Sequence, residues 1–393
     1  MPYRTMNDTR NILIVSGACY PELTPRAFRT TELARQLARR GHRVTLLLPN
    51  RAIFHEHPLR EEGLEVIFAS GPVEGAEGSA VSRRNGRLRR FMPEIVQKAV
   101  LYFYCHELWV KYDPGLCARL AELRGPFDAV LSISYPAAVH LAVARAMRRN
   151  PVLRRAVTIA EFSDPPFRGD VAQNVFPGYY LWLKRWGRLF DWFAVPVEKA
   201  LPCYTPYMDR SRIRVIPQGF DLDAIPLPDY VPHSEPTFAY AGRFYENIRD
   251  PQFFFDFLET VDSPFCFDLY INHLDDRFAD MIRRAQQRVR GRIVLHDPLP
   301  RERLIGRLAE ADFLVNFDNT TSNATPSKLI DYAIARRPIL SFNDRTFDAG
   351  AFRAALRGDY AGQVRGIDLA DYDIRTVAAR FLALIDEGKR TDR

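Results

Sequence analysis

A Pro-Ser-Lys turn opens a helical pattern within the segment ATPSKLIDYAIARRPIL at 324–340. Lys328 stands at the start of this pattern, and Asp331 follows three residues later. The first turn of a helix offers free backbone N–H groups and the positive end of the helix dipole to an anion, and a lysine there adds a point charge. We expect Lys328 to contact a diphosphate. Asp331, about one turn further in, is expected to accept hydrogen bonds from both hydroxyls of a ribose.

The same residues have a simpler interpretation. In an isolated S-x-x-D pattern, Ser327 would be a helix cap, and Lys328 and Asp331 would be solvated surface residues. Here the turn, the helix and a proline that leads into a hydrophobic strand occur together over 324–340. This longer context favours ligand binding by Ser327, Lys328 and Asp331.

A second segment, TFAYAGRFYENIRDP at 237–251, places two arginines after a strand-like run. A diphosphate leaving group gains negative charge as the bond to it breaks, so fixed cations aimed at it lower the barrier. Arginine can bind such a group through two N–H donors. Arg243 and Arg249 are the candidates for these cations. The alternative is an ordinary turn at the end of a strand, with arginines on the surface.

Both segments resemble the donor-binding parts of family 4 glycosyltransferases and their GT-B relatives, which commonly read P-x-K-[LIF]-x-[ED]-Y-x-A-x-x-x-P before a hydrophobic strand. The run VIPQGFD at 215–221 is similar to the turn that closes the first domain in that family. The resemblance spans most of the chain, because turn, linker, phosphate loop and donor helix occur in the family's order. It implies that a nucleotide-sugar donor is bound by Arg243, Arg249, Ser327, Lys328 and Asp331.

The chain departs from this family in two places. Many members have a second acid eight positions before the first, where it holds the transferred sugar, and this sequence has Asn323 there. An amide can still bond sugar hydroxyls, so Asn323 is kept as a donor-binding candidate, with the donor sugar left open. In the first domain, Gly17 remains of a glycine-rich loop that borders acceptor and cleft, but Leu23-Thr24-Pro25 stands where a glycine pair is usual.

A candidate catalytic residue lies in the segment TIAEFSDPPFRG at 158–169, which resembles the strand end "DFxDPW" of some of these sugar transferases. The resemblance places Asp164 at the carboxyl edge of a sheet, facing the cleft. At about 3 Å from an acceptor hydroxyl, Asp164 could act as a general base, as in inverting GT-B enzymes. In a retaining enzyme it would orient the acceptor. A cap for the turn before Pro165-Pro166 is the alternative, and the stereochemical outcome stays open.

Alternating strand and helix patterns must position these residues. Apolar runs of strand length lie at 11–16, 44–48, 64–69, 129–133, 157–162 and 213–217, and again at 237–241, 267–271, 293–295, 313–317 and 338–342. Helical patterns separate them, and this alternation builds parallel sheets with helices on both faces. The proline-rich stretch 222–236 marks a linker.

The sequence therefore predicts an α/β protein of the GT-B type, with two Rossmann-like domains whose parallel sheets face a central cleft. The resemblance implies that residues 1–221 form the acceptor-binding domain and 237–393 the donor-binding domain. The resemblance implies that the final helix, at about 374–386, packs back on the first domain.

The charge is divided unevenly, because residues 1–220 hold 32 Lys and Arg against 20 Asp and Glu, whereas 221–393 hold 23 against 28. A basic half suits an anionic partner such as acidic lipid or a lipid pyrophosphate. Arginines and aromatic residues cluster at 83–112 and 176–193, which favours peripheral contact with an anionic membrane. The alternative is that these rings form a core under a helix. Nucleic acid is disfavoured, since the sequence contains no recognisable module for it.

Other classes of protein are excluded or disfavoured by motifs that the sequence lacks. It contains no apolar run of about 18 residues, and its opening residues do not read as a secretory signal, so we expect a cytoplasmic protein, peripheral at most to the inner face of a membrane. The five scattered cysteines read as free thiols. No GxGxxG or Walker pattern occurs, and no DxD-type acidic triplet stands at a strand end where it would be expected to ligate a metal ion, so no cofactor and no metal are expected.

Together these observations predict a metal-independent, hexosyltransferase-type enzyme. It would transfer a sugar from a UDP- or GDP-sugar to a hydroxyl of a lipid-linked or surface-polysaccharide acceptor. Two alternatives remain, namely a GT-B nucleotide-sugar epimerase and a non-catalytic nucleotide-sugar-binding or membrane-associated protein.

Overall fold

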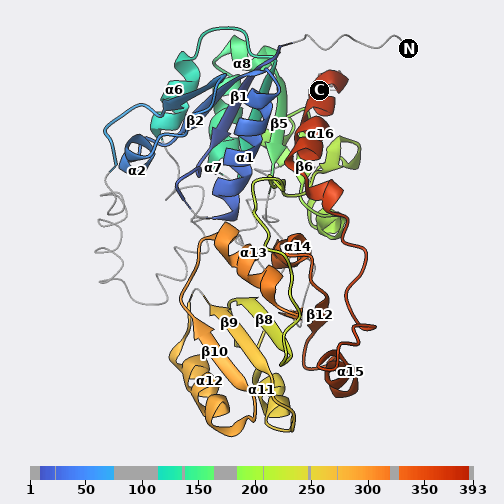
Figure 1. The fold of residues 1–393 in the computed structure, drawn as a ribbon. Helices are drawn as coiled ribbons and strands as arrows, with labels where there is room; N and C mark the ends of the chain where they lie inside the picture. The colour runs from blue at the N-terminus through green and yellow to red at the C-terminus, as the bar shows by residue number, and fades with distance from the viewer. Residues whose placement is uncertain are drawn as a thin grey trace, which may run out of the picture. The chain divides into compact units, whose positions relative to one another are not determined.

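The computed structural model describes residues 9–22, 24–74, 114–134, 138–162, 184–206, 208–246, 249–271, 273–318 and 327–388. The chain forms two compact units. The first contains Met1–Phe220 and Asp371–Arg393, and the second contains Asp221–Ala370. The C-terminal segment thus belongs to the first unit, although the second unit precedes it in the sequence (Figure 1).

A parallel sheet with strand order β3-β2-β1-β4-β5-β6-β7 forms the centre of the first unit. In the described part of the chain its strands are β1 (Asn11–Ser16), β2 (Arg43–Leu48), β3 (Leu64–Phe68), β4 (Ala129–Ile133), β5 (Val157–Glu161), β6 (Trp192–Val195) and β7 (Ile213–Val215). The order reverses between β1 and β4, which is the topological switch point of a doubly wound sheet. The carboxyl ends of these two strands are therefore where a ligand is expected to bind.

Both faces of this sheet are covered, so its strands read as continuous apolar runs. Side chains alternate along β1: Leu13 and Val15 pack in one core, and Ile12 and Ile14 pack in the other. Within the described ranges the α-helices of this unit are α1 (Pro25–Arg39), α2 (Ala52–Glu56), α6 (Pro114–Glu122), α7 (Ala138–Met147), α8 (Pro151–Arg155), α10 (Leu201–Tyr204) and α16 (Ile374–Glu387).

Helix α1 begins where its sequence predicts. The side chain of Thr24 accepts a hydrogen bond from the backbone N of Ala27 at 3.2 Å, and Pro25 occupies the first helical position. Both features favour a helix start. The helix ends before Gly41, whose φ of 84° suits a residue without a side chain.

Helix α16 packs beside α1 and completes one core of the first unit, as Figure 1 shows. Val377 and Phe381 are fully buried in that core. The approach of α16 requires a glycine at 219, because a Cβ there would lie 2.7 Å from Cδ1 of Ile374 and 3.1 Å from Cβ of Val377. The turn VIPQGFD and the C-terminal helix therefore fit against each other.

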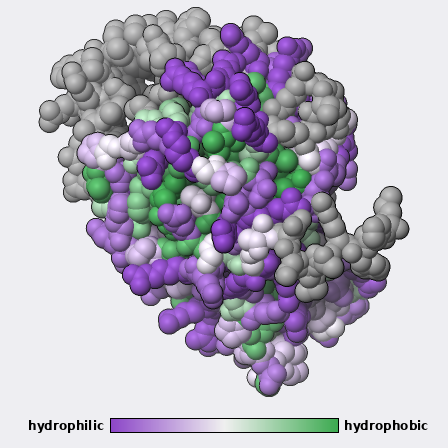
Figure 2. All heavy atoms as spheres, turned by 90° about the horizontal axis from the view of Figure 1, so that it is seen from above, coloured by the Kyte–Doolittle hydropathy of each residue, from purple (hydrophilic) through white to green (hydrophobic). Residues whose placement is uncertain are grey.

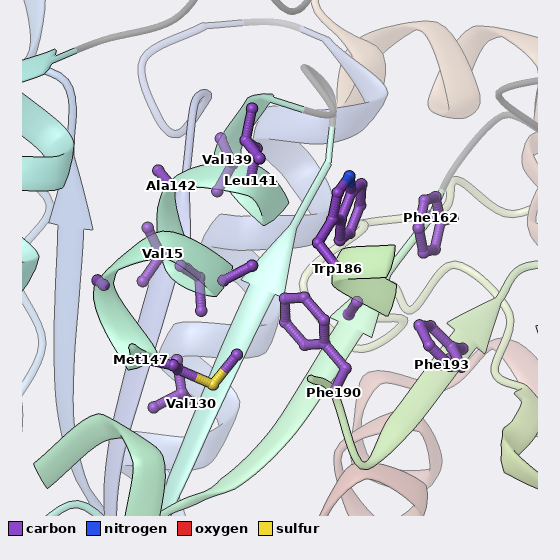
Figure 3. Packing of buried hydrophobic residues seen from close by; sticks show 14 of the residues in the cluster. Val15, Val130, Val139, Leu141, Ala142, Met147, Phe162, Trp186, Phe190 and Phe193 are labelled. Atoms are coloured by element: carbon purple, nitrogen blue, oxygen red, sulfur yellow. The ribbon is translucent and has the colours of Figure 1, made fainter. Parts of the chain in front are cut away.

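The second aromatic segment, 176–193, belongs in part to the core (Figure 3). Trp186, Phe190 and Phe193 pack together with Phe162 in one cluster, and Trp192 is buried in the other. Rings inside the protein cannot lie at the depth of lipid headgroups, so the membrane interpretation is wrong for these residues of the segment. The rest of the segment up to residue 183, and the segment 83–112, lie outside the described residues.

The second unit is built on a parallel sheet of order β10-β9-β8-β11-β12. Among the described residues its strands are β8 (Thr237–Gly242), β9 (Cys266–Ile271), β10 (Arg292–His296), β11 (Phe313–Phe317) and β12 (Ile339–Phe342), and its helices are α11 (Gln252–Leu258), α12 (Asp276–Arg288), α13 (Arg301–Glu310), α14 (Ser327–Ile334) and α15 (Ala349–Ala355). The phenylalanine-rich helix α11, together with α12 and α15, packs against the face that carries Phe238 and Tyr240.

No disulfide occurs among the described cysteines, Cys19, Cys117, Cys203 and Cys266. None of the described helices combines the length and the apolar character that are needed to cross a membrane.

Candidate functional site

Three of the predicted donor-binding residues, Arg243, Arg249 and Lys328, lie where β8 ends and α14 begins, within the second unit. Gly242 is the last residue of β8, and its φ of 153° lies outside the range that residues with a side chain commonly adopt. A Cβ at this position would lie 2.8 Å from the hydroxyl oxygen of Tyr240 and 3.6 Å from Nζ of Lys328. The glycine therefore makes room for the Tyr240 hydroxyl, and the Lys328 ammonium lies within van der Waals distance of the same strand end.

Lys328 is a buried cation that has no hydrogen-bonding partner among the described residues. Its Nζ lies 4.6 Å from the centroid of the Tyr240 ring, and no described residue accepts a hydrogen bond from it. Burial and the positive charge of Arg249 hold the pKa of Lys328 well below its ordinary value, and Asp318 partly opposes them. Leaving such a group unpaired is costly. An anion bound here would supply the missing partner.

Arg243 and Arg249 are brought together by a tight turn. The backbone N of Arg249 donates to the O of Tyr245 at 2.9 Å, and the N of Tyr245 donates to the O of Arg249 at 3.2 Å. The Nη1 of Arg249 also donates to the O of Arg243 at 3.2 Å. Both guanidinium groups lie over the ring of Tyr245, at 5.1 and 5.9 Å from its centroid. Arg243 and Arg249, which are six residues apart in the sequence, thus lie close together in space.

A small polar network holds Asp318 at the end of β11. Its Oδ1 accepts hydrogen bonds from Nδ2 of Asn316 at 2.6 Å and from the hydroxyl of Ser341 at 2.8 Å. This carboxylate is the one whose charge favours protonated Lys328. Lys328 therefore has an acidic neighbour, Asp318, whose carboxylate is held by hydrogen bonds from residues of β11 and β12.

Asp331 forms an ion pair with Arg301, the first residue of α13. The Nε and Nη2 atoms of Arg301 lie 3.0 and 2.5 Å from Oδ1 of Asp331. Burial raises the pKa of Asp331, and the charge and hydrogen bonds of Arg301 oppose this rise. Sequence reasoning missed Arg301, because it lies 30 residues away in a different helix and no motif includes it.

Tyr332 was also missed as a functional residue, although the tyrosine is part of the quoted family pattern. Its hydroxyl accepts from the backbone N of Ala241 at 2.7 Å and donates to the O of Ala241 at 3.1 Å. This contact attaches α14 to the end of β8. It fixes the position of Lys328, one turn earlier on the same helix.

The first unit holds a buried ionic cluster that sequence reasoning did not identify. The carboxylate of Glu161, the last residue of β5, lies 2.7 Å from Nη1 of Arg26 and 3.1 Å from Nε of Arg29. Arg26 also donates to the O of Ser134 at 2.8 Å, and Arg29 to the O of Ile216 at 2.9 Å. The cluster therefore joins α1, the ends of β4 and β5, and the turn VIPQGFD.

The remaining predicted residues are placed less completely. Gly17 follows β1 directly, at the carboxyl edge of the first sheet. Ser327 is the first residue of α14, and its side chain lies outside the described residues, as do Asp164 and Asn323. A cavity of about 430 Å³ in the second unit is lined by His296, Asp268 and Tyr270 among others and by none of the predicted donor-binding residues.

No protein-family model and no curated protein matches the sequence. The structure is similar to a glycosyltransferase from Rickettsia africae ESF-5, with a TM-score of 0.58 and 12% identity, covering 97% of this chain and 99% of that chain. It is similar to HepE of Anabaena, solved in complex with UDP, with a TM-score of 0.58 and 9% identity over 96% and 100% of the chains.

A third similar structure is the lipopolysaccharide outer core galactosyltransferase WaaB in its apo form, with a TM-score of 0.55 and 10% identity over 96% of this chain and 99% of that chain. Identities this low establish the fold and not the activity. The two parallel sheets have the strand orders given above, and the similarity to these structures extends over nearly the whole of each chain. The predicted fold is confirmed: the chain has the GT-B fold, with two Rossmann-like units.

Proposed function

We propose that this protein is a glycosyltransferase that transfers a sugar from a nucleotide diphosphate sugar, a UDP- or GDP-sugar, to a hydroxyl acceptor. The observation that carries the proposal is the buried ammonium of Lys328, which has no hydrogen-bond partner among the described residues. It stands beside Arg249 at the start of a helix. A diphosphate matches this arrangement in charge and in place.

The proposed chemistry follows from the charge that develops on the donor. As the glycosidic bond breaks, negative charge grows on the leaving diphosphate, and Arg243, Arg249 and Lys328 stabilise it where it appears. Asp331 holds the ribose, and Asn323 and Ser327 complete the donor contacts. In this proposal the three side chains neutralise the charge, so a metal ion is not required. Asp164 acts on, or orients, the acceptor hydroxyl.

The acceptor in this proposal is lipid-linked or part of a surface polysaccharide. WaaB is described as a lipopolysaccharide outer core galactosyltransferase, and HepE is solved with UDP. Both support a nucleotide-sugar donor and a glycan acceptor as the general kind of substrate. The net positive charge of residues 1–220 favours an anionic acceptor or membrane surface at the cytoplasmic side.

The described residues that suit such a surface lie at the end of α7 and on α8. Residues 138–156 contain no Asp or Glu. Five exposed arginines lie within this stretch: Arg145, Arg148, Arg149, Arg154 and Arg155. Figure 2 views the molecule from the side where α8 lies in Figure 1, and hydrophilic residues cover much of that face. We propose this arginine cluster as the contact with an anionic surface.

The first experiment is a titration of the protein with UDP, GDP and ADP in which the melting temperature is measured at each concentration. A ligand that binds only the native state raises this temperature. One nucleotide is expected to stand out. The Lys328→Met variant should lose this shift, and Lys199→Met, which changes an exposed lysine of the first unit, should keep it. If no nucleotide shifts the melting temperature of the unmodified protein, the proposal is wrong.

A second measurement separates transfer from its alternatives. An epimerase would convert the nucleotide sugar alone, and a binding protein would bind it without releasing the nucleotide. A transferase releases the nucleotide at a rate that depends on the acceptor concentration. Acceptor-independent conversion would therefore replace the transferase proposal with the epimerase.

A further inference from the structure

The ion pair between Arg301 and Asp331 leaves half of the carboxylate available. Both hydrogen bonds from Arg301 end on Oδ1 of Asp331, and no hydrogen bond to Oδ2 occurs among the described residues. The side chains are 18% and 23% exposed, so the pair is mostly enclosed but reachable from solvent. Oδ2 can therefore still accept hydrogen bonds from a ligand.

An enclosed carboxyl group needs a cation to stay ionised. Burial raises the pKa of Asp331, and Arg301 is the group that lowers it. Once protonated, the carboxyl would itself carry a hydrogen and would accept hydrogen bonds more weakly. To accept hydrogen bonds from both ribose hydroxyls, the Asp331 carboxyl group must therefore be ionised.

The geometry also fixes the direction of the carboxylate. Two N–H groups of a planar guanidinium that converge on one oxygen restrict rotation of the Asp331 side chain. Arg301 itself is held at the start of α13, which follows Pro300. Asp331 is in the first turns of α14, so the pair also joins these two helices.

We propose that Arg301 is a positioning residue for the nucleotide ribose: it keeps Asp331 ionised and turned so that Oδ2 faces the ribose hydroxyls. The inference rests on the proposed function, because it requires a nucleotide in the site next to Lys328. Arg301 acts through Asp331 and makes the site selective for a ribose with both hydroxyls.

The test compares the preferred nucleotide diphosphate with its 2′,3′-dideoxy analogue. Dissociation constants for both are measured by calorimetry from about pH 5 to about pH 9, a range that spans a moderately raised carboxyl pKa. The protein should prefer the ribonucleotide roughly ten- to a hundredfold, the value of one charge-assisted hydrogen bond or more. This preference should persist to the acid end of the range.

In Arg301→Met the preference should fall at acid pH and return as the pH rises through the higher pKa of Asp331. The midpoint of that return should lie at a higher pH than in the unmodified protein. Arg301→Lys keeps the charge and should give an intermediate midpoint. Asp331→Asn should lose the preference at every pH, and Arg303→Met, an exposed arginine two residues away on the same helix, should behave like the unmodified protein.

The outcomes separate this inference from the proposed function. If the unmodified protein binds neither nucleotide, the proposed function fails. If it binds and prefers the ribonucleotide, but Arg301→Met weakens both ligands equally at every pH, Arg301 has only a structural role and the inference fails. Should Arg301→Met not fold, the shift of the midpoint in Arg301→Lys decides the question in the same way.

Discussion

The hydroxyl of Tyr332 is bonded to both backbone polar groups of Ala241, at 2.7 Å from N and 3.1 Å from O. Strands β8 and β11 pair only at Phe238 and Ala239, so β8 has no ladder partner on that side at Ala241 in the described part of the sheet. The tyrosine takes the place of the missing strand. A buried backbone N–H and C=O would otherwise be left without partners.

Tyr332→Phe should therefore weaken both the second unit and the site. The free energy of unfolding should fall by about 1–3 kcal/mol, because buried backbone groups lose their hydrogen bonds. Nucleotide affinity should also fall, because α14 carries Lys328. Calorimetric unfolding and nucleotide titration measure the two effects. Tyr360→Phe, a partly buried tyrosine in the same unit, is the control for affinity. Unchanged stability and affinity in Tyr332→Phe would show that the contact is dispensable.

Nucleotide binding should be accompanied by proton uptake at Lys328. Burial and Arg249 lower its pKa in the free protein, and a bound diphosphate raises the pKa again because it favours the charged form. Between these two pKa values the complex binds a proton that the free protein lacks, so affinity falls as the pH rises through that range. Calorimetry in buffers of different ionisation enthalpy measures the uptake, which should not exceed about one proton for a single group. Uptake that persists in Lys328→Met would assign it to another group.

The sequence predicts the regular elements well because their patterns are local. The run 11–16 is observed as β1, and the run 237–241 as β8. The basic turn with Arg243 and Arg249 and the helix with Lys328 were also readable, because each is a short segment. Their meeting at Gly242 follows from the parallel sheet, since the ends of β8 and β11 lie on one edge.

Long-range partners could not be predicted in this way. The charge of Arg29 alone predicts an exposed side chain, yet this side chain is fully buried, because Glu161 and the carbonyl of Ile216 accept hydrogen bonds from it. In the same way, the ion pair of Arg301 with Asp331 joins two helices that lie apart in the sequence. A charged residue gives no sign of its distant partner in a single sequence.

The cluster around Glu161 predicts a large effect on stability. Glu161→Ala leaves Arg29 buried without an anion, and breaking such a pair costs about 3–5 kcal/mol. Urea unfolding followed by tryptophan fluorescence reports on the first unit, since the four tryptophans lie at 109, 182, 186 and 192. Glu198→Ala, at an exposed salt bridge with Arg210, should change stability by less than about 1 kcal/mol. Equal effects of the two substitutions would contradict this account.

The arginine cluster on α7 and α8 predicts binding to anionic membranes. Each arginine near an anionic surface contributes about 1 kcal/mol, so the triple variant Arg148→Ala, Arg149→Ala, Arg155→Ala should bind vesicles with acidic lipid roughly a hundredfold more weakly. Binding of the unmodified protein should also fall as salt is added, because these charges are exposed and screened.

Co-sedimentation with vesicles of neutral lipid and of neutral lipid mixed with phosphatidylserine measures both effects. The control variant is Arg283→Ala, Arg284→Ala, which removes two exposed arginines of α12 in the acidic second unit. It should bind like the unmodified protein, because the cluster and not the total charge supplies the contact. If the control and the triple variant lose binding to the same degree, the attraction is general. If the unmodified protein does not bind acidic vesicles at low salt, the proposed membrane contact is wrong.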